Sequence, residues 1–105
     1  MALTCCQGAV VGPDGNIWGI PSKADCLLRI DPRVDEATTV GNLPSTRDKW
    51  QGGAVAADER GRAAIWCIPE SAEAVLKVVP GLDGEETEVT LVGITHRGVE
   101  MQCRE

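Results

Sequence analysis

The chain has 105 residues, with 16 acidic and 10 basic side chains and a formal net charge of −6. Its 43 % hydrophobic and 25 % charged residues are typical of one small globular domain and exclude a disordered chain. No apolar run approaches the roughly 18 residues of a membrane helix, no secretory signal opens the chain, and the acidic balance argues against nucleic acid or an anionic membrane as a partner.

The first half of the chain contains four short apolar runs separated by turn residues. We expect strands at Gly8–Val11, Ile17–Ile20, Leu27–Asp31 and Ala37–Val40. The runs are rich in β-branched residues and too short for helices. Leu28-Arg29-Ile30 alternates in the manner of a strand, and Pro13-Asp14-Gly15-Asn16 predicts a tight turn between the first two runs.

The second half repeats the first. Residues 7–14 align with 51–58, residues 17–21 with 65–69, and residues 24–32 with 72–80. The spacing between the copies grows by four residues around Glu59-Arg60-Gly61-Arg62, a point where a turn tolerates insertion. The best helical candidate, Ser71–Val79, aligns with a strand of the first copy and is therefore also expected to be a strand.

Four strands in about 44 residues is the size of a β-propeller blade. We therefore expect an all-β fold of two four-stranded antiparallel propeller-type blades, which is an incomplete propeller. The first repeat spans residues 7–50 and the second spans residues 51–93. Residues 94–105 are expected to be the C-terminal stub of a further repeat, because Met101-Gln102 resembles the Trp50-Gln51 lead-in of the second copy.

The segment Gly12–Trp18, followed by Leu28-Arg29-Ile30-Asp31-Pro32, resembles the repeat of streptogramin lyase-like β-propellers and the wider NHL-like and YVTN-like groups. The resemblance implies a propeller fold, which many functions share. In the lyase family the Trp is followed by Phe-Thr-Glu, whereas Gly19-Ile20-Pro21 follows here. No catalytic residue is carried over from the family.

Two blades alone would leave two apolar sheet faces uncovered. Three arrangements solve this problem. Three or four chains could close a ring of six or eight blades as a homo-oligomer. The chain could be a fragment of a larger propeller, or its eight strands could pack as a two-sheet sandwich.

Loops at one end of a propeller often meet ligands, so the link between the copies is the first candidate for binding. The candidate binding residues are Arg47, Asp48, Lys49, Trp50 and, after the second copy, His96. Trp18 and Trp66 occupy matching positions, where core packing is expected and a sugar- or base-stacking platform is the alternative. The acidic cluster of Asp83, Glu85, Glu86 and Glu88 is expected to be a solvated connection, with calcium binding as the alternative.

The five cysteines, at positions 5, 6, 26, 67 and 103, show no metal-binding spacing, so neither a metal nor another cofactor is expected. Cys26 and Cys67 are expected to be small buried hydrophobes, and Cys5-Cys6 either two loop thiols or an intermolecular disulfide. The absence of a signal favours a cytoplasmic location. We expect a non-catalytic module for partner binding or self-assembly; the alternative is part of a lyase- or lactonase-like propeller enzyme whose active site needs further blades or subunits.

Overall fold

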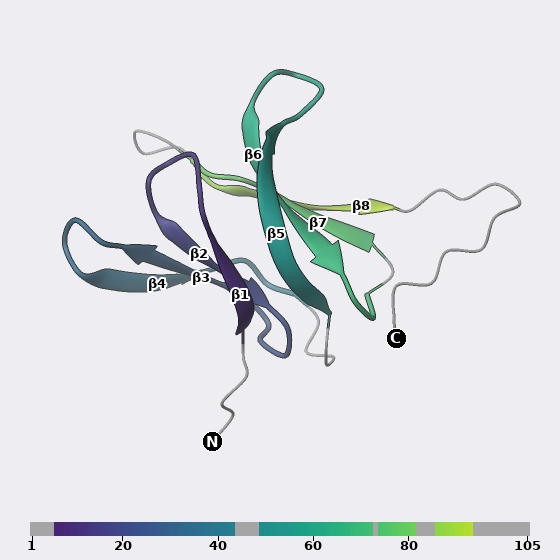
Figure 1. Ribbon diagram of the computed structural model, residues 1–105, viewed down its shortest axis with the longest axis horizontal. Helices are drawn as coiled ribbons and strands as arrows, with labels where there is room; N and C mark the ends of the chain where they lie inside the picture. The colour runs from purple at the N-terminus through teal and green to yellow at the C-terminus, as the bar shows by residue number, and fades with distance from the viewer. Residues whose placement is uncertain (1–5, 44–48, 73, 82–85, 94–105) are drawn as a thin grey trace, which may run out of the picture.

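The computed structural model describes residues 6–43, 49–72, 74–81 and 86–93. In these ranges the regular elements are eight β-strands, which run outward in two fans in Figure 1. In chain order they are β1 (Cys6–Val11), β2 (Ile17–Pro21), β3 (Leu27–Asp31), β4 (Glu36–Val40), β5 (Trp50–Ala57), β6 (Ala63–Pro69), β7 (Ala74–Val79) and β8 (Glu88–Gly93). The described residues include no helix long and apolar enough to cross a membrane.

The strands form two four-stranded antiparallel sheets with the orders β1-β2-β3-β4 and β5-β6-β7-β8. The expected all-β class with two four-stranded sheets is therefore confirmed. The predicted strand Leu27–Asp31 has the observed bounds of β3, and Ser71–Val79 contributes β7 rather than a helix. Each strand pairs with the next along the chain, so both sheets are simple meanders.

The first hairpin of each sheet closes with the same turn. The Gly12 amide donates to the Asn16 carbonyl at 2.8 Å, and the Gly15 amide donates to the Gly12 carbonyl at 3.0 Å. In the second sheet, the Asp58 amide donates to the Arg62 carbonyl at 2.8 Å, and the Gly61 amide donates to the Asp58 carbonyl at 2.9 Å. Gly15 and Gly61 have φ of 84° and 80°, which glycine adopts without the steric cost of a Cβ atom.

The four inserted residues lengthen the second hairpin. In the first sheet the pairing of β1 with β2 ends at Val11 opposite Ile17. The matching pair, Val55 opposite Ile65, is followed by two further pairs of alanines, 56 with 64 and 57 with 63. The turn position of Asp58 therefore corresponds to that of Gly12. The sequence alignment of Asp14 with Asp58 is wrong at this point, because the inserted residues extend the strands and leave the turn itself unchanged.

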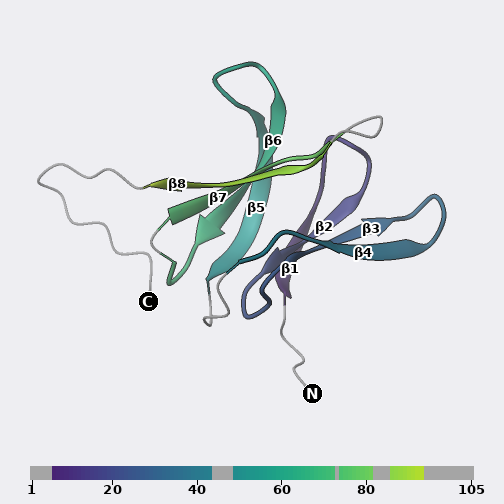
Figure 2. The same cartoon turned by 180° about the vertical axis from the view of Figure 1, so that it is seen from behind.

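The hydrophobic core lies between the two sheets. β1 and β5, the first strands of the sheets, run side by side (Figures 1 and 2). β4 and β8 are the strands at the opposite edges of their sheets. Side chains from both sheets form one buried cluster, to which Leu43 adds from the connection between the sheets and Trp50 from the start of β5. The members of this cluster are Trp18, Ile20, Leu27, Leu43, Trp50, Ile65, Cys67, Leu76 and Val78.

Candidate functional site

One face of each sheet supplies the core. Side chains alternate between the two faces of a strand, so the register places each residue on one face. The face of the first sheet toward the core, here the Trp18 face, carries Val10, Trp18, Ile20, Leu27 and Val40. The opposing face of the second sheet, here the Ile65 face, carries Ile65, Cys67, Leu76, Val78 and Val89. Val55 and Leu91 lie on the same face but outside the contact, and they are 41 % and 51 % exposed.

The two faces touch at specific places. A Cβ atom added to Gly53 of β5 would lie 3.4 Å from Cδ1 of Ile20. A Cβ atom added to Gly41, just after β4, would lie 3.6 Å from Leu27 and 3.7 Å from Val89. The sheets are therefore in van der Waals contact, and the Trp18 face and the Ile65 face together form an interface inside the chain.

The repeat places a second copy of the Trp18 face on the outside of the second sheet. This surface, the Trp66 face, carries Ala54, Trp66, Ile68, Val75 and Val92. Ile68 is 51 % exposed and Val92 is 37 % exposed. The residue that matches Ile68 in the first copy is Ile20, which is fully buried. The same apolar pattern is thus covered in one sheet and open in the other.

A second copy of the Ile65 face lies on the outside of the first sheet. This surface, the Ile17 face, carries Ile17, Gly19, Leu28, Ile30 and Ala37. Ile17, Leu28 and Ile30 are partly exposed, whereas the matching Ile65, Leu76 and Val78 are fully buried. The chain therefore carries two faces of the Trp18 type and two of the Ile65 type. Among the described residues, one face of each type packs inside the chain and the other faces outward.

A cation covers the indole in each copy. The Arg29 guanidinium lies 5.8 Å from the centre of the Trp18 ring, and Lys77 Nζ lies 5.4 Å from that of Trp66. These pairs sit directly opposite each other on neighbouring strands, so the strand register brings them together. The shared arrangement supports the equivalence of the Trp18 and Trp66 faces.

The indole nitrogen has a different partner in each copy. In the first sheet Trp18 Nε1 donates to the Asp14 carboxylate at 3.0 Å, and the same carboxylate accepts the Asn16 amide at 3.2 Å. In the second sheet the longer hairpin moves the turn away, and Trp66 Nε1 donates instead to the Ala56 carbonyl at 3.0 Å. Both bonds hold the indole against its sheet.

Asp58 is the centre of an ion-pair network at the edge of the Trp66 face. Its carboxylate lies 2.9 Å from Lys77 Nζ and 3.0 Å from the Arg62 guanidinium, and its side chain is 1 % exposed. Arg62 also pairs with Glu88 at 3.0 Å. The hydrogen bond from Lys77, assisted by bonds from Arg62 and Arg60, holds the pKa of Asp58 far below its usual value, against the opposing effect of burial.

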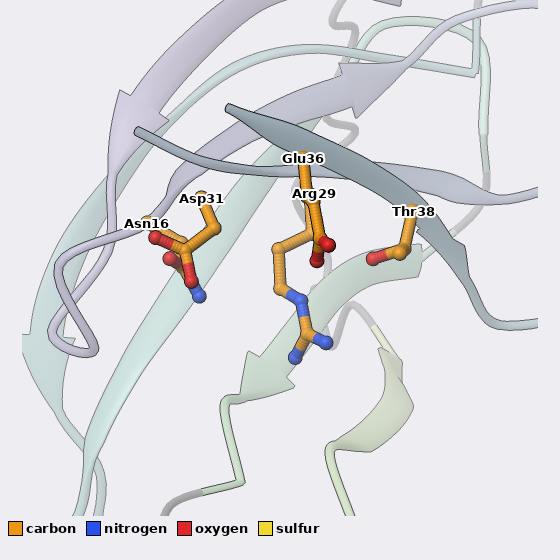
Figure 3. A pocket seen from close by; sticks show the side chains of 5 residues that line it. All are labelled: Asn16, Arg29, Asp31, Glu36 and Thr38. Carbon is orange, nitrogen blue, oxygen red and sulfur yellow. The ribbon is translucent and has the colours of Figure 1, made fainter. Parts of the chain in front are cut away.

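A small polar pocket opens beside β3 and β4. Its volume is about 160 Å³, below the range of about 300–1,000 Å³ typical of small-molecule sites. Figure 3 shows the Arg29 side chain with Thr38 on one side of it and Asn16 and Asp31 on the other, while Glu36 overlaps it in this view. Together these side chains line the pocket. One cation beside two carboxylates gives the pocket no net attraction for an anion.

The candidate binding segment between the copies is described only in part. Lys49 and Trp50 are each 2 % exposed. Lys49 Nζ donates to the Ser22 carbonyl at 3.0 Å, and Trp50 Nε1 donates to the Ala74 carbonyl at 2.8 Å. Burial lowers the pKa of Lys49, and the Asp25 carboxylate opposes that shift. The two side chains join the sheets, so a ligand would have to open the core to reach them; the binding role stays a prediction.

The remaining predicted candidates are only partly described. Arg47, Asp48 and His96 lie outside the described residues, as do Asp83, Glu85 and the cysteines at positions 5 and 103. Cys67 is buried, as expected, and Cys26 is partly buried. In the ranges the structure describes, His, Cys, Asp and Glu form no group of three or more that could hold a metal ion.

The sequence predicted two uncovered apolar faces but did not show which residues they carry, because both faces of these strands are apolar. A repeat-by-repeat comparison of burial is the signal that finds them. Comparison of the chain with protein-family models, with curated proteins and with solved structures found no match.

Proposed function

We propose that the chain is a non-catalytic repeat module, built of two propeller-type blades, that binds a partner through its outward sheet faces. The observation that carries this proposal is the Trp66 face. It repeats the apolar pattern of a buried face, yet Ile68 and Val92 on it are exposed.

The arrangement of the strands supports the identification of each sheet as a propeller-type blade. Each sheet is a four-stranded meander in chain order, as blades are. β1 and β5 lie side by side (Figure 1), and β4 and β8 are the edge strands farthest from them in the sheet orders. Blades around a common axis place their first strands together in this way, and they pack face to face with their neighbours.

Burial of the Trp66 face would favour association. Fully burying one large apolar side chain contributes about 1.5–3 kcal/mol, and Ile68 and Val92 both have surface left to bury. Lys77, the cation on this face, is already engaged by Asp58 and the Trp66 ring. Packing is therefore the chemistry that this face offers, rather than proton or group transfer.

Charge placed on the Trp66 face tests the proposal. Val34→Asp is the control for Ile68→Asp. Val34 is an exposed apolar side chain like Ile68, but it lies in the turn after β3, off both sheet faces. We expect the wild-type chain to associate or, when diluted to a monomer, to bind an apolar fluorescent dye. Ile68→Asp should lose association and bind less dye, because only its Ile17 face stays open, and Val34→Asp should keep both properties. A wild-type monomer that binds no dye would overturn the proposed function.

A further inference from the structure

We propose that the partner of the Trp66 face is the Ile17 face of a second copy of this chain, so that chains associate head to tail. This inference rests on the proposed function and names its partner. It follows from the interface inside the chain, which already shows how a face with the Trp18 pattern packs on a face with the Ile65 pattern.

The two open faces are copies of the two faces that pack together. The open Trp66 face matches the Trp18 face through the pairs Trp18/Trp66, Ile20/Ile68, Leu27/Val75 and Val40/Val92. The open Ile17 face matches the Ile65 face through Ile65/Ile17, Leu76/Leu28 and Val78/Ile30. Each pair conserves a large apolar side chain. The remaining positions of the open faces carry smaller residues: Gly19 for Cys67, Ala37 for Val89 and Ala54 for Val10. The internal interface therefore provides a template for an interface between two chains at its largest side chains.

The glycines of the innermost strands give a second, independent indication. Gly8 and Gly52 occupy matching bulges in β1 and β5, with φ of 84° and 74°. A Cβ atom added to Gly8 would lie 3.3 Å from the Gly52 backbone, whereas a Cβ atom added to Gly52 would meet nothing within 4 Å. In the head-to-tail arrangement Gly8 of the next copy fills that open space.

The contact joins two different faces, so a pair of associated chains still has one free Trp66 face on one chain and one free Ile17 face on the other. Such contacts propagate until a rotation closes the ring. Closed propellers have about four to eight blades, which corresponds to about two to four chains of this length. Face-to-face pairing of two identical Trp66 faces would instead stop at a dimer and leave both Ile17 faces uncovered.

Two complementary variants test the inference. Ile68→Asp disables the Trp66 face and Leu28→Asp disables the Ile17 face. Each variant alone should be a monomer in reductant, whereas an equimolar mixture should form a heterodimer of twice the 11.1 kDa chain mass and nothing larger. Val92→Asp and Ala37→Asp repeat the test at exposed positions, where an aspartate does not enter the core. Val34→Asp, the control, should keep the wild-type mass.

Other outcomes would overturn the inference in distinguishable ways. If Leu28→Asp still dimerises while Ile68→Asp is a monomer, the Trp66 face pairs with itself. If the wild-type chain is a monomer whose Trp66 face binds the apolar dye, a different occupant covers that face, such as further blades of a longer chain. Both outcomes leave the proposed function standing. A monomer without dye binding would overturn the inference and the proposed function together.

A glycine substitution tests the geometry of the contact. Gly52→Ala should weaken association by about tenfold or more, because its methyl group would meet the next copy. Gly61→Ala is the matched control: Gly61 has a similar φ of 80° and nothing within 4 Å, but it lies in the β5–β6 turn. Equal effects of the two substitutions on association would contradict the proposed contact.

Discussion

Trp18 and Trp66 hold the same position on the second strands of their sheets, and each lies beneath a cation from the neighbouring strand, but only Trp18 is fully buried. The difference comes from the second sheet, which covers the face of the first. The five residues around each tryptophan differ at a single position, Gly19 against Cys67. The relation between the copies, rather than either copy alone, shows which surface is left for a partner.

The two tryptophans should therefore differ in their contribution to stability. In the monomeric Ile68→Asp background, Trp18→Ala should lower the free energy of unfolding by about 3–5 kcal/mol, because it empties a large space in the core. Trp66→Ala should cost about 1–2 kcal/mol there, since part of the ring is already exposed. Urea unfolding followed by circular dichroism measures both. Equal losses would show that the two faces are equally covered in the monomer.

Asp58 should make the fold sensitive to acid. Its pKa in the folded chain lies well below the usual aspartate value of 3.8, mainly through the hydrogen bond from Lys77. The stability that this carboxylate contributes is therefore complete above about pH 5 and is lost as the pH falls through 3.8 toward the lower folded value. Asp58→Asn should lower the melting temperature at pH 7 and flatten its decline below pH 4.

Glu59→Gln is the control for Asp58→Asn, because Glu59 is the exposed neighbour of Asp58 in the same turn and makes no ion pair among the described residues. Glu59→Gln should leave the melting temperature at pH 7, and the decrease in melting temperature below pH 4, close to those of the wild type. If Asp58→Asn and wild type lose stability in parallel below pH 4, the network around Asp58 is not the source of the acid sensitivity.

Cys67 should resist thiol reagents in the folded chain. Burial raises its pKa to about 12, so the reactive thiolate is scarce at pH 8. In a chain whose other four cysteines are serine, we expect a disulfide reagent to modify Cys67 only as fast as the fold opens. A second chain carries Ile68→Cys and Cys67→Ala, with the other four cysteines again replaced by serine. Its one thiol lies on the opposite face of β6. That thiol should react rapidly in dilute solution and become protected at concentrations where chains associate. Rapid modification of Cys67 in native buffer would contradict its placement in the core.

The sequence predicted the strands well because turn chemistry and the repeat reinforced each other. Pro13-Asp14-Gly15 and Asp31-Pro32 mark the strand ends, and the alignment with the first copy correctly assigned Ser71–Val79 to a strand. The hairpin extension was not predictable in detail, because alanines 56, 57, 63 and 64 carry no alternation. The aspartates at 14 and 58 were then aligned by identity rather than by their places in the turns.

The burial of particular side chains was harder to predict than the strands. Lys49 was a candidate for binding because it lies in the link between the copies. Lysine is rarely buried, yet the connection from β4 to β5 carries Lys49 between the sheets. Both faces of each sheet are apolar, so alternation could place residues on faces but could not show which face is covered. That information depends on how the two sheets pack, which involves contacts between residues far apart in the chain.

The mass of the wild-type chain in solution, measured by light scattering over a range of concentrations with reductant present, tests the central claim most directly. Association through the Trp66 and Ile17 faces predicts a defined species of about two to four chains that persists in reductant and dissociates on dilution. A folded chain that remains at 11.1 kDa at every concentration would contradict the account.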